Sequence, residues 1–293
     1  MESLRARDPE AIGPYRLVGR LGEGGMGVVY LALGETGMVA IKTVGNGESF
    51  DLNESARFQR EVANQLLIKS PFVARIIDSG LDEHQAWIAM EYVSGKNLSA
   101  LLPEGQGLSK NLWWSVAMGC ASALATVSQE GLIHRDVKPA NIMLSNTGPK
   151  LVDFGIARNP EETSITVSGS LTGSPAWLSP EQLNDLGLST AVDIFSLASV
   201  LYYCNNGTSP WGTLGKSSTS VFMKAISDHE PSFEGFDPDQ IDLLAPMLNK
   251  KPHERPTALE VGTAIREIAE DRLDLYFAWL EIHRLGKPAS EPG

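Results

Sequence analysis

Residues 134–141 read His-Arg-Asp-Val-Lys-Pro-Ala-Asn, and the triplet Asp153-Phe154-Gly155 follows twelve positions after Asn141. Carboxylate and amide oxygens at Asp136, Asn141 and Asp153 are the kind of ligand that Mg²⁺ prefers. A carboxylate such as Asp136 can also accept the proton of a reacting hydroxyl. A carboxylate and a lysine two residues apart are common on surface loops, so this pair gains meaning only from the ordered motifs around it.

Composition limits the class of protein. The chain has 293 residues, 42% of them hydrophobic and 20% charged, which is the balance of a globular protein with a buried core. Its net charge of −12 disfavours binding to a phosphate backbone, so we expect no nucleic-acid partner. Cys120 and Cys204 lie in apolar helical stretches and are expected to be reduced.

The chain shows no targeting or spanning segment. Met1–Pro9 is charged and lacks the apolar stretch of a signal peptide. The longest uncharged run, Asn111–Gln129, is rich in small residues, which predicts a buried core helix and not a membrane span. We therefore expect a cytoplasmic location and no membrane span in this chain.

Secondary-structure patterns change once along the chain. Short apolar or alternating runs broken by glycine predict strands up to about residue 93, with one helix over 53–68. Beyond Gly95 the pattern is mostly helical, and Val93–Gly95 is the expected hinge. The predicted strands are Tyr15–Leu21, Val28–Leu33, Met38–Val44, Phe72–Asp78 and Ala86–Tyr92, and the later helices are 97–102, 111–130, 190–205, 218–227, 239–248 and 257–284.

Gly22, Gly24 and Gly27 form a G-x-G-x-x-G pattern, which alone is a weak signal. A dinucleotide-binding loop must open a helix, whereas the β-branched residues after Gly27 favour a strand. A glycine loop between two strands can fold its N–H groups over nucleotide phosphates, although a plain hairpin turn also explains it. Lys42 in Val39-Ala40-Ile41-Lys42 places a cation on the next strand.

With Ser179-Pro180-Glu181 downstream, four motifs stand in order, and the sequence resembles the protein kinase superfamily from about Tyr15 to Thr257. The texts GEGGMGVVY (22–30) and LSPEQ (178–182) resemble the bacterial eukaryotic-like, or Hanks-type, serine/threonine kinases. The resemblance implies an α+β, bilobal protein kinase fold with a small β-rich lobe and a larger helical lobe. The implied divisions are 12–94, 95–270, a helical extension 271–285 and a flexible tail 286–293.

The resemblance also implies the cofactors, ATP and Mg²⁺ with Mn²⁺ as an alternative, and a role for each site residue. Asp136 would accept the hydroxyl proton and Lys138 would stabilise the transferring phosphoryl group. Lys42, oriented by Glu61, would hold the phosphates, and Asn141 and Asp153 would bind the metal. The nucleotide-binding residues would be Leu21, Gly22, Glu23, Gly24, Gly25, Met26, Gly27, Val28, Val29, Ala40, Lys42, Met90, Glu91, Val93, Met143 and Asp153.

Two further matches are structural. Asp193 is expected to hold the backbone of the catalytic loop, and Arg255 is expected to pair with Glu181. The implied activity is transfer of the γ-phosphate of ATP to Ser/Thr hydroxyls of protein substrates in signalling, including the chain itself. Thr166 and Ser168 are the predicted autophosphorylation sites.

Two alternatives remain: a small-molecule kinase of the same fold, and a non-catalytic module. The long segment from Asp153 to Glu181 disfavours the first alternative. Retention of Lys42, Asp136 and Asp153 disfavours the second. An apolar face over 273–282 is expected either to dock on the chain's own larger lobe or to contact a second protomer.

Overall fold

The computed structural model describes residues 1–24, 27–44, 52–82, 85–154, 175–184, 187–212 and 219–269. The chain divides into two compact units between Val93 and Ser94. The predicted helical extension 271–285 and the tail 286–293 lie outside the described residues.

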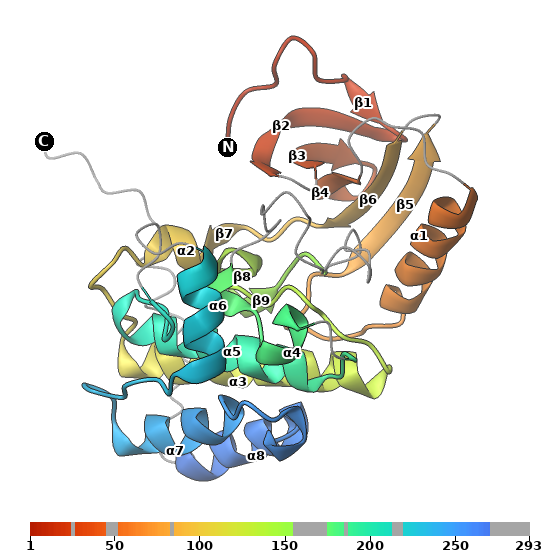
Figure 1. Cartoon of the computed structure of the whole chain (residues 1–293). Helices are drawn as coiled ribbons and strands as arrows, with labels where there is room; N and C mark the ends of the chain where they lie inside the picture. Colours follow the sequence, from red (N-terminus) through yellow and green to blue (C-terminus); the bar gives the residue numbers. More distant parts are fainter. Residues whose placement is uncertain are drawn as a thin grey trace, which may run out of the picture. The chain divides into compact units, whose positions relative to one another are not determined.

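The first unit is built on a six-stranded antiparallel sheet in the order β1-β2-β3-β4-β6-β5 (Figure 1). Each strand pairs with a neighbour close in sequence, apart from β6, which lies between β4 and β5. One helix, α1 (Leu52–Gln65), belongs to this unit. The strands are β1 (Ala11–Ile12), β2 (Tyr15–Gly24), β3 (Gly27–Gly34), β4 (Gly37–Val44), β5 (Ile76–Asp82) and β6 (Gln85–Glu91).

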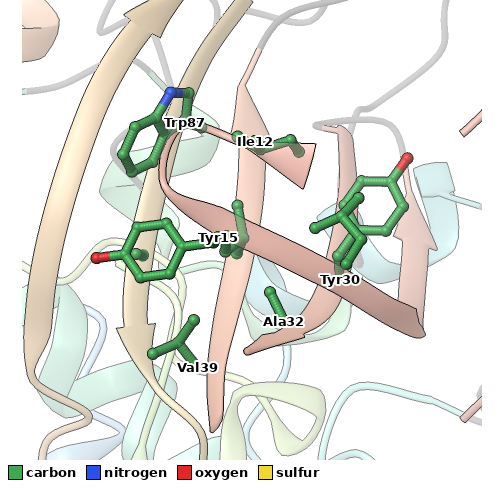
Figure 2. Close-up of a cluster of buried hydrophobic side chains, with 9 residues drawn as sticks. Ile12, Tyr15, Tyr30, Ala32, Val39 and Trp87 are labelled. Carbon is green, nitrogen blue, oxygen red and sulfur yellow. The ribbon is translucent and has the colours of Figure 1, made fainter. Parts of the chain in front are cut away.

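Side chains alternate between the two faces of this sheet, so each face buries its own core. On one face, Tyr15 and Trp87 meet edge to face with ring centroids 5.8 Å apart (Figure 2). The other face packs against Phe58 and Val62 of α1. The first core comprises Ile12, Tyr15, Leu17, Tyr30, Ala32, Val39, Ile41, Trp87 and Ala89, and the second adds Val44, Ile76, Ala86 and Ile88 to the two α1 residues.

Strand β5 was predicted over Phe72–Asp78, but it runs over Ile76–Asp82. The prediction was wrong because it placed the strand on the apolar residues 72–78, whereas the pairing of β5 with β6 is set by Trp87 of β6. Gly80 faces Trp87, and a Cβ at Gly80 would lie 2.3 Å from the indole ring. Only a glycine fits opposite so large a side chain, and this sets the register of a strand that is polar in sequence.

The second unit is mainly helical, which confirms the predicted α+β fold class. The uncharged run forms α3 (Lys110–Gln129), whose Trp113 and Trp114 are fully buried, as predicted. Its other α-helices are α2 (Leu98–Leu101), α4 (Pro180–Leu183), α5 (Ala191–Asn206), α6 (Thr219–Asp228), α7 (Pro238–Met247) and α8 (Ala258–Ala269). A small sheet in the order β7-β8-β9 consists of β7 (Gly95–Asn97), β8 (Ile142–Ser145) and β9 (Gly148–Leu151).

Helices α3 and α5 contain the two cysteines. Cys120 and Cys204 are both free thiols and both buried, as their apolar surroundings predicted. Burial raises the pKa of Cys120 to about 12, so its thiol stays protonated and behaves as a core residue. Within the described ranges, none of the helices combines the length and the apolar character needed to span a bilayer.

Candidate active site

A carboxylate with two nitrogen donors forms the centre of the candidate site in the second unit. Lys138 Nζ and Asn141 Nδ2 both donate to Asp136 Oδ2, at 2.8 and 2.9 Å. Asn141 Nδ2 also donates to the carbonyl oxygen of Asp136 at 2.9 Å. Asn141 ends the short 3₁₀ turn Pro139–Asn141, which brings its side chain back toward Asp136. The predicted catalytic group is therefore oriented by two neighbours from the same loop.

The backbone of this loop is held by Asp193, from the first turn of α5. Its carboxylate accepts N–H bonds from His134 at 2.7 Å and from Arg135 at 2.8 Å, as predicted. Arg135 has a φ of 65°, a left-handed conformation that costs energy for a residue with a side chain. Burial raises the pKa of Asp193, and the two N–H donors oppose that shift. The strained turn is thus fixed by a buried acceptor.

Asp153 and Phe154 follow β9. Asp153 also has a left-handed backbone, with a φ of 64°. The Phe154 ring packs on His134, with centroids 4.5 Å apart. His134 is fully buried, which lowers its pKa to about 4, so the imidazole is neutral at pH 7. Its Nδ1 accepts the N–H of Asp136 at 3.3 Å. His134 therefore links Phe154 to the Asp136 backbone as a packed, uncharged residue.

The predicted metal ligands are the side-chain oxygens of Asn141 and Asp153. Asn141 Nδ2 donates to Asp136, which fixes the orientation of the amide. The amide oxygen, Asn141 Oδ1, is then the atom that could bind a metal ion. In the described part of the chain, no three His, Cys, Asp or Glu side chains cluster to enclose a metal. Mg²⁺ is commonly held by one or two protein oxygens together with substrate phosphates. Asn141 and Asp153 fit that mode of binding.

The glycine loop lies in the first unit, between β2 and β3, and its glycines are not equivalent. Gly27 has a φ of 127°, and a Cβ there would lie 2.1 Å from the Thr43 carbonyl oxygen, so the fold itself requires glycine. A Cβ at Gly22 or Gly24 would meet no described atom within 4 Å. Contacts with the described residues therefore do not require glycine at those two positions.

Thr43 of β4 binds the backbone next to the glycine loop, and the sequence motifs did not single it out. Its hydroxyl accepts the Val28 N–H at 3.1 Å and donates to the Val28 carbonyl at 3.2 Å. A threonine in the otherwise apolar text Val39-Ala40-Ile41-Lys42-Thr43-Val44 was the available signal.

Four of the predicted nucleotide contacts lie on one face of the sheet. Val29 pairs with Lys42, and Ala40 pairs with Met90, so the period of two places all four on the same side. This is the side that packs against α1, because Ile88, the other partner of Lys42, belongs to that core. Lys42 is 7% exposed. A buried lysine on a sheet face differs from the solvated strand lysine that its sequence alone would permit.

The remaining predicted adenine contacts fall in both units. Leu21 is 36% exposed near the end of β2, and Val93 is buried at the end of the first unit. Glu91 donates its N–H to the Arg75 carbonyl at 2.8 Å. Met143 lies in β8 of the second unit. Gly25 and Met26 lie outside the described residues.

Glu61 of α1 pairs with an arginine on its own helix. Its Oε1 accepts from Arg57 Nε at 3.2 Å, and its buried Oε2 has no hydrogen-bond partner among the described residues. The pairing of Glu61 with Lys42 that the resemblance implied stays a prediction. A buried oxygen without a donor is costly, so the side chain is in place to accept a further one.

A buried ion pair stabilises the larger unit. Arg255 donates to both carboxylate oxygens of Glu181, at 2.6 and 2.9 Å, as predicted. It also donates to the Ala191 carbonyl at 2.9 Å, so it joins α4 to the start of α5. In α4, Ser179 and Gln182 form a capping box, which explains the Ser-Pro-Glu-Gln text.

The sequence profile of the protein kinase domain matches residues 15–264. The chain belongs to the protein kinase family. The predicted resemblance and fold are confirmed, and this family uses ATP with a divalent metal ion.

Relatives with curated names support a bacterial subgroup. A probable serine/threonine-protein kinase, PkwA of Thermomonospora curvata, is 35% identical over 89% of this chain and 35% of its own. The serine/threonine-protein kinase AfsK of Streptomyces coelicolor is 33% identical over 100% of this chain and 38% of its own. The crystal structure of the PknI kinase domain of M. tuberculosis matches with a TM-score of 0.68 and 26% identity, covering 88% of this chain and 96% of that one. The chain thus spans about a third of the length of the two relatives named.

Proposed function

We propose that this chain transfers the γ-phosphoryl group of ATP to Ser/Thr hydroxyls of proteins, including its own, with Mg²⁺ or Mn²⁺. The observation that supports this most directly is the oriented carboxylate of Asp136, to which Lys138 and Asn141 both donate. A kinase needs a base for the hydroxyl and a cation for the developing phosphoryl charge. Asp136 and Lys138 lie on one loop, whose strained backbone is held by hydrogen bonds to Asp193.

The roles of the residues follow from their chemistry. The substrate oxygen bonds to the γ-phosphorus while the bond from that phosphorus to ADP breaks, and the hydroxyl proton passes to Asp136. Lys138 compensates negative charge on the phosphoryl group as it moves. Asn141 and Asp153 would hold the divalent ion, which neutralises phosphate charge when bound.

In the first unit, the nucleotide would use the open space at Gly22 and Gly24 and the cation of Lys42. Met90, Glu91 and Val93 would contact the adenine, with Leu21, Val29 and Ala40 as apolar cover. These assignments come from the family resemblance, and the shared sheet face of Val29, Ala40, Lys42 and Met90 supports them.

The test is transfer of labelled phosphate from ATP to a generic basic protein, with Mg²⁺ and then Mn²⁺. Lys42→Met and Asp136→Asn should each lose transfer while keeping the melting temperature. Lys69→Met and Asp242→Asn are matched controls, because both side chains belong to exposed residues. Absence of transfer by the unmodified chain with either metal would refute the activity.

Self-modification is a separate part of the proposal. Thr166 and Ser168 lie outside the described residues, and their assignment rests on their place between Asp153 and Glu181 in the sequence. After incubation with ATP, mass spectrometry should find phosphate on these two residues. An active enzyme without phosphate in this segment would contradict the assignment.

The C-terminal extension is the proposed route to an oligomer. Residues 271–285 carry the broad apolar face, and α8 is described up to Ala269. Cutting the chain after Ala269 should turn a dimer into a monomer if the face joins two protomers. A lower melting temperature at unchanged mass would show docking on the chain's own unit instead.

A further inference from the structure

The first ten residues, which no predicted element included, pack along β2. We refer to Met1–Glu10 as the N-terminal strap. Glu2 pairs with Arg20 through two backbone hydrogen bonds, of 2.9 and 2.8 Å. Leu4 packs against the aromatic core that Figure 2 shows. A Cβ at Gly19 would lie 2.8 Å from the Glu2 carbonyl oxygen, so the strap approaches β2 as closely as only glycine permits.

A buried ion pair fixes the strap to the strand. The Asp8 carboxylate accepts from Arg20 Nε at 2.7 Å, and their side chains are only 3% and 10% exposed. The Tyr30 hydroxyl donates to the same carboxylate at 3.0 Å. The hydrogen bond from Arg20 is the main reason that the pKa of Asp8 is held far below its usual value. Asp8 is therefore ionised, and its carboxylate fixes the position of the Arg20 side chain.

From this anchor, the contacts reach the glycine loop. Arg20 Nη1 donates to Glu23 Oε2 at 2.8 Å, and Arg5 Nη1 of the strap lies 2.8 Å from the same oxygen. Glu23 stands between Gly22 and Gly24 and carries the only side chain of that tripeptide. Two arginines, Arg5 on the strap and Arg20 bound by it, thus hold the side chain of Glu23.

We propose that the N-terminal strap positions the glycine-rich loop for nucleotide phosphates, acting through Arg5, Asp8, Arg20 and Glu23. This inference rests on the proposed ATP-dependent function. Glycine segments lose more backbone entropy than others when they are ordered, so a fixed Glu23 lowers the cost of ordering the loop on ATP. The two guanidinium groups also neutralise Glu23, which would otherwise repel a triphosphate.

The mechanism predicts an effect on ATP affinity and not on the chemical step. Arg5 and Glu23 form an exposed ion pair, with side chains 56% and 51% exposed. Loss of an exposed pair is expected to change affinity by about two- to fivefold. Asp8→Asn should have a larger effect, because it weakens the hold on Arg20. Adenosine, which has no phosphates, should bind equally well to all variants.

The experiment uses the full chain and compares Arg5→Ala with Arg7→Ala, which removes the same charge from an exposed residue of the same strap. Steady-state kinetics should show a raised KM for ATP in Arg5→Ala and Asp8→Asn, with kcat within about twofold. Arg5→Lys should have a KM for ATP between those of the unmodified chain and Arg5→Ala. Gly19→Ala, which displaces the strap from β2, should raise the KM for ATP in the same way.

Three results would overturn the proposal. If Arg5→Ala and Asp8→Asn match Arg7→Ala in KM for ATP while the unmodified chain is active, the strap only stabilises the fold and the kinase function stands. If adenosine binding weakens as much as ATP binding, the strap does not act on the phosphates. If the unmodified chain neither transfers phosphate nor binds ATP, the proposed function fails, and this inference fails with it.

Discussion

Replacing Arg255 by methionine should destabilise the larger unit more than any exposed charge substitution. The Arg255 side chain is 0% exposed and Glu181 is 3% exposed, so the change leaves a buried carboxylate without its bidentate donor. It also removes the bond to the Ala191 carbonyl. Breaking one partner of a buried ion pair costs about 3–5 kcal/mol. For a unit of this size that corresponds to a fall in melting temperature of roughly 10 °C.

Thermal unfolding followed by circular dichroism provides the assay, with a double-mutant cycle. Glu181→Leu alone should also destabilise, because it leaves a buried cation. The double variant, Arg255→Met with Glu181→Leu, should be less destabilised than the sum of the two, since no unpaired charge remains. Lys251→Ala removes one member of an exposed pair with Glu254 and should leave the melting temperature unchanged.

Two outcomes would refute this reasoning. One is a melting temperature for Arg255→Met equal to that of the Lys251→Ala control. The other is a double variant whose loss equals the sum of the single losses, because the two side chains would then not be coupled.

Three further predictions test other parts of the structure. Gly27→Ala should destabilise the first unit by about 1–3 kcal/mol because of its left-handed φ and the nearby carbonyl, whereas Gly22→Ala should keep the melting temperature and raise the KM for ATP. The unfolded state binds a proton at His134 below pH 6.5, but the folded state does so only near pH 4, so stability is lost as the pH falls through this window. The free energy of unfolding of the unmodified chain, measured by chemical denaturation relative to His134→Gln, should therefore fall by about 3 kcal/mol between pH 6.5 and pH 4. A difference between the two proteins that stays constant with pH would contradict the assignment. Arg57→Ala should raise the activity of unphosphorylated enzyme by up to about twofold, the value of one helix ion pair, if Arg57 withholds Glu61; unchanged kcat/KM would show that it does not.

Local sequence was enough to predict most of the helices and the main strands of the first unit. Periodicity predicted β2, β3, β4 and β6, and it predicted α3 as a buried helix. It did not predict β1, the bounds of β5 or the small sheet of β7, β8 and β9. The ordered motifs predicted the kinase family, and within it Asp193 and the pair of Glu181 with Arg255. These features are readable because each depends on a short stretch with its own period or on a fixed spacing of polar residues.

The tertiary structure decided what depends on contacts between distant residues. Gly80 is at its place in β5 because Trp87 occupies the space beside it, and no local pattern in 72–82 reveals that. Glu61 accepts a hydrogen bond from Arg57 of its own helix, a contact that the motifs did not indicate. The strap has no periodic pattern, and its role depends on Asp8 meeting Arg20 across a fold in the chain. The sequence by itself determined which chemical groups are present, whereas packing determined which of them meet, because a contact across the fold depends on the register and shape of both partners.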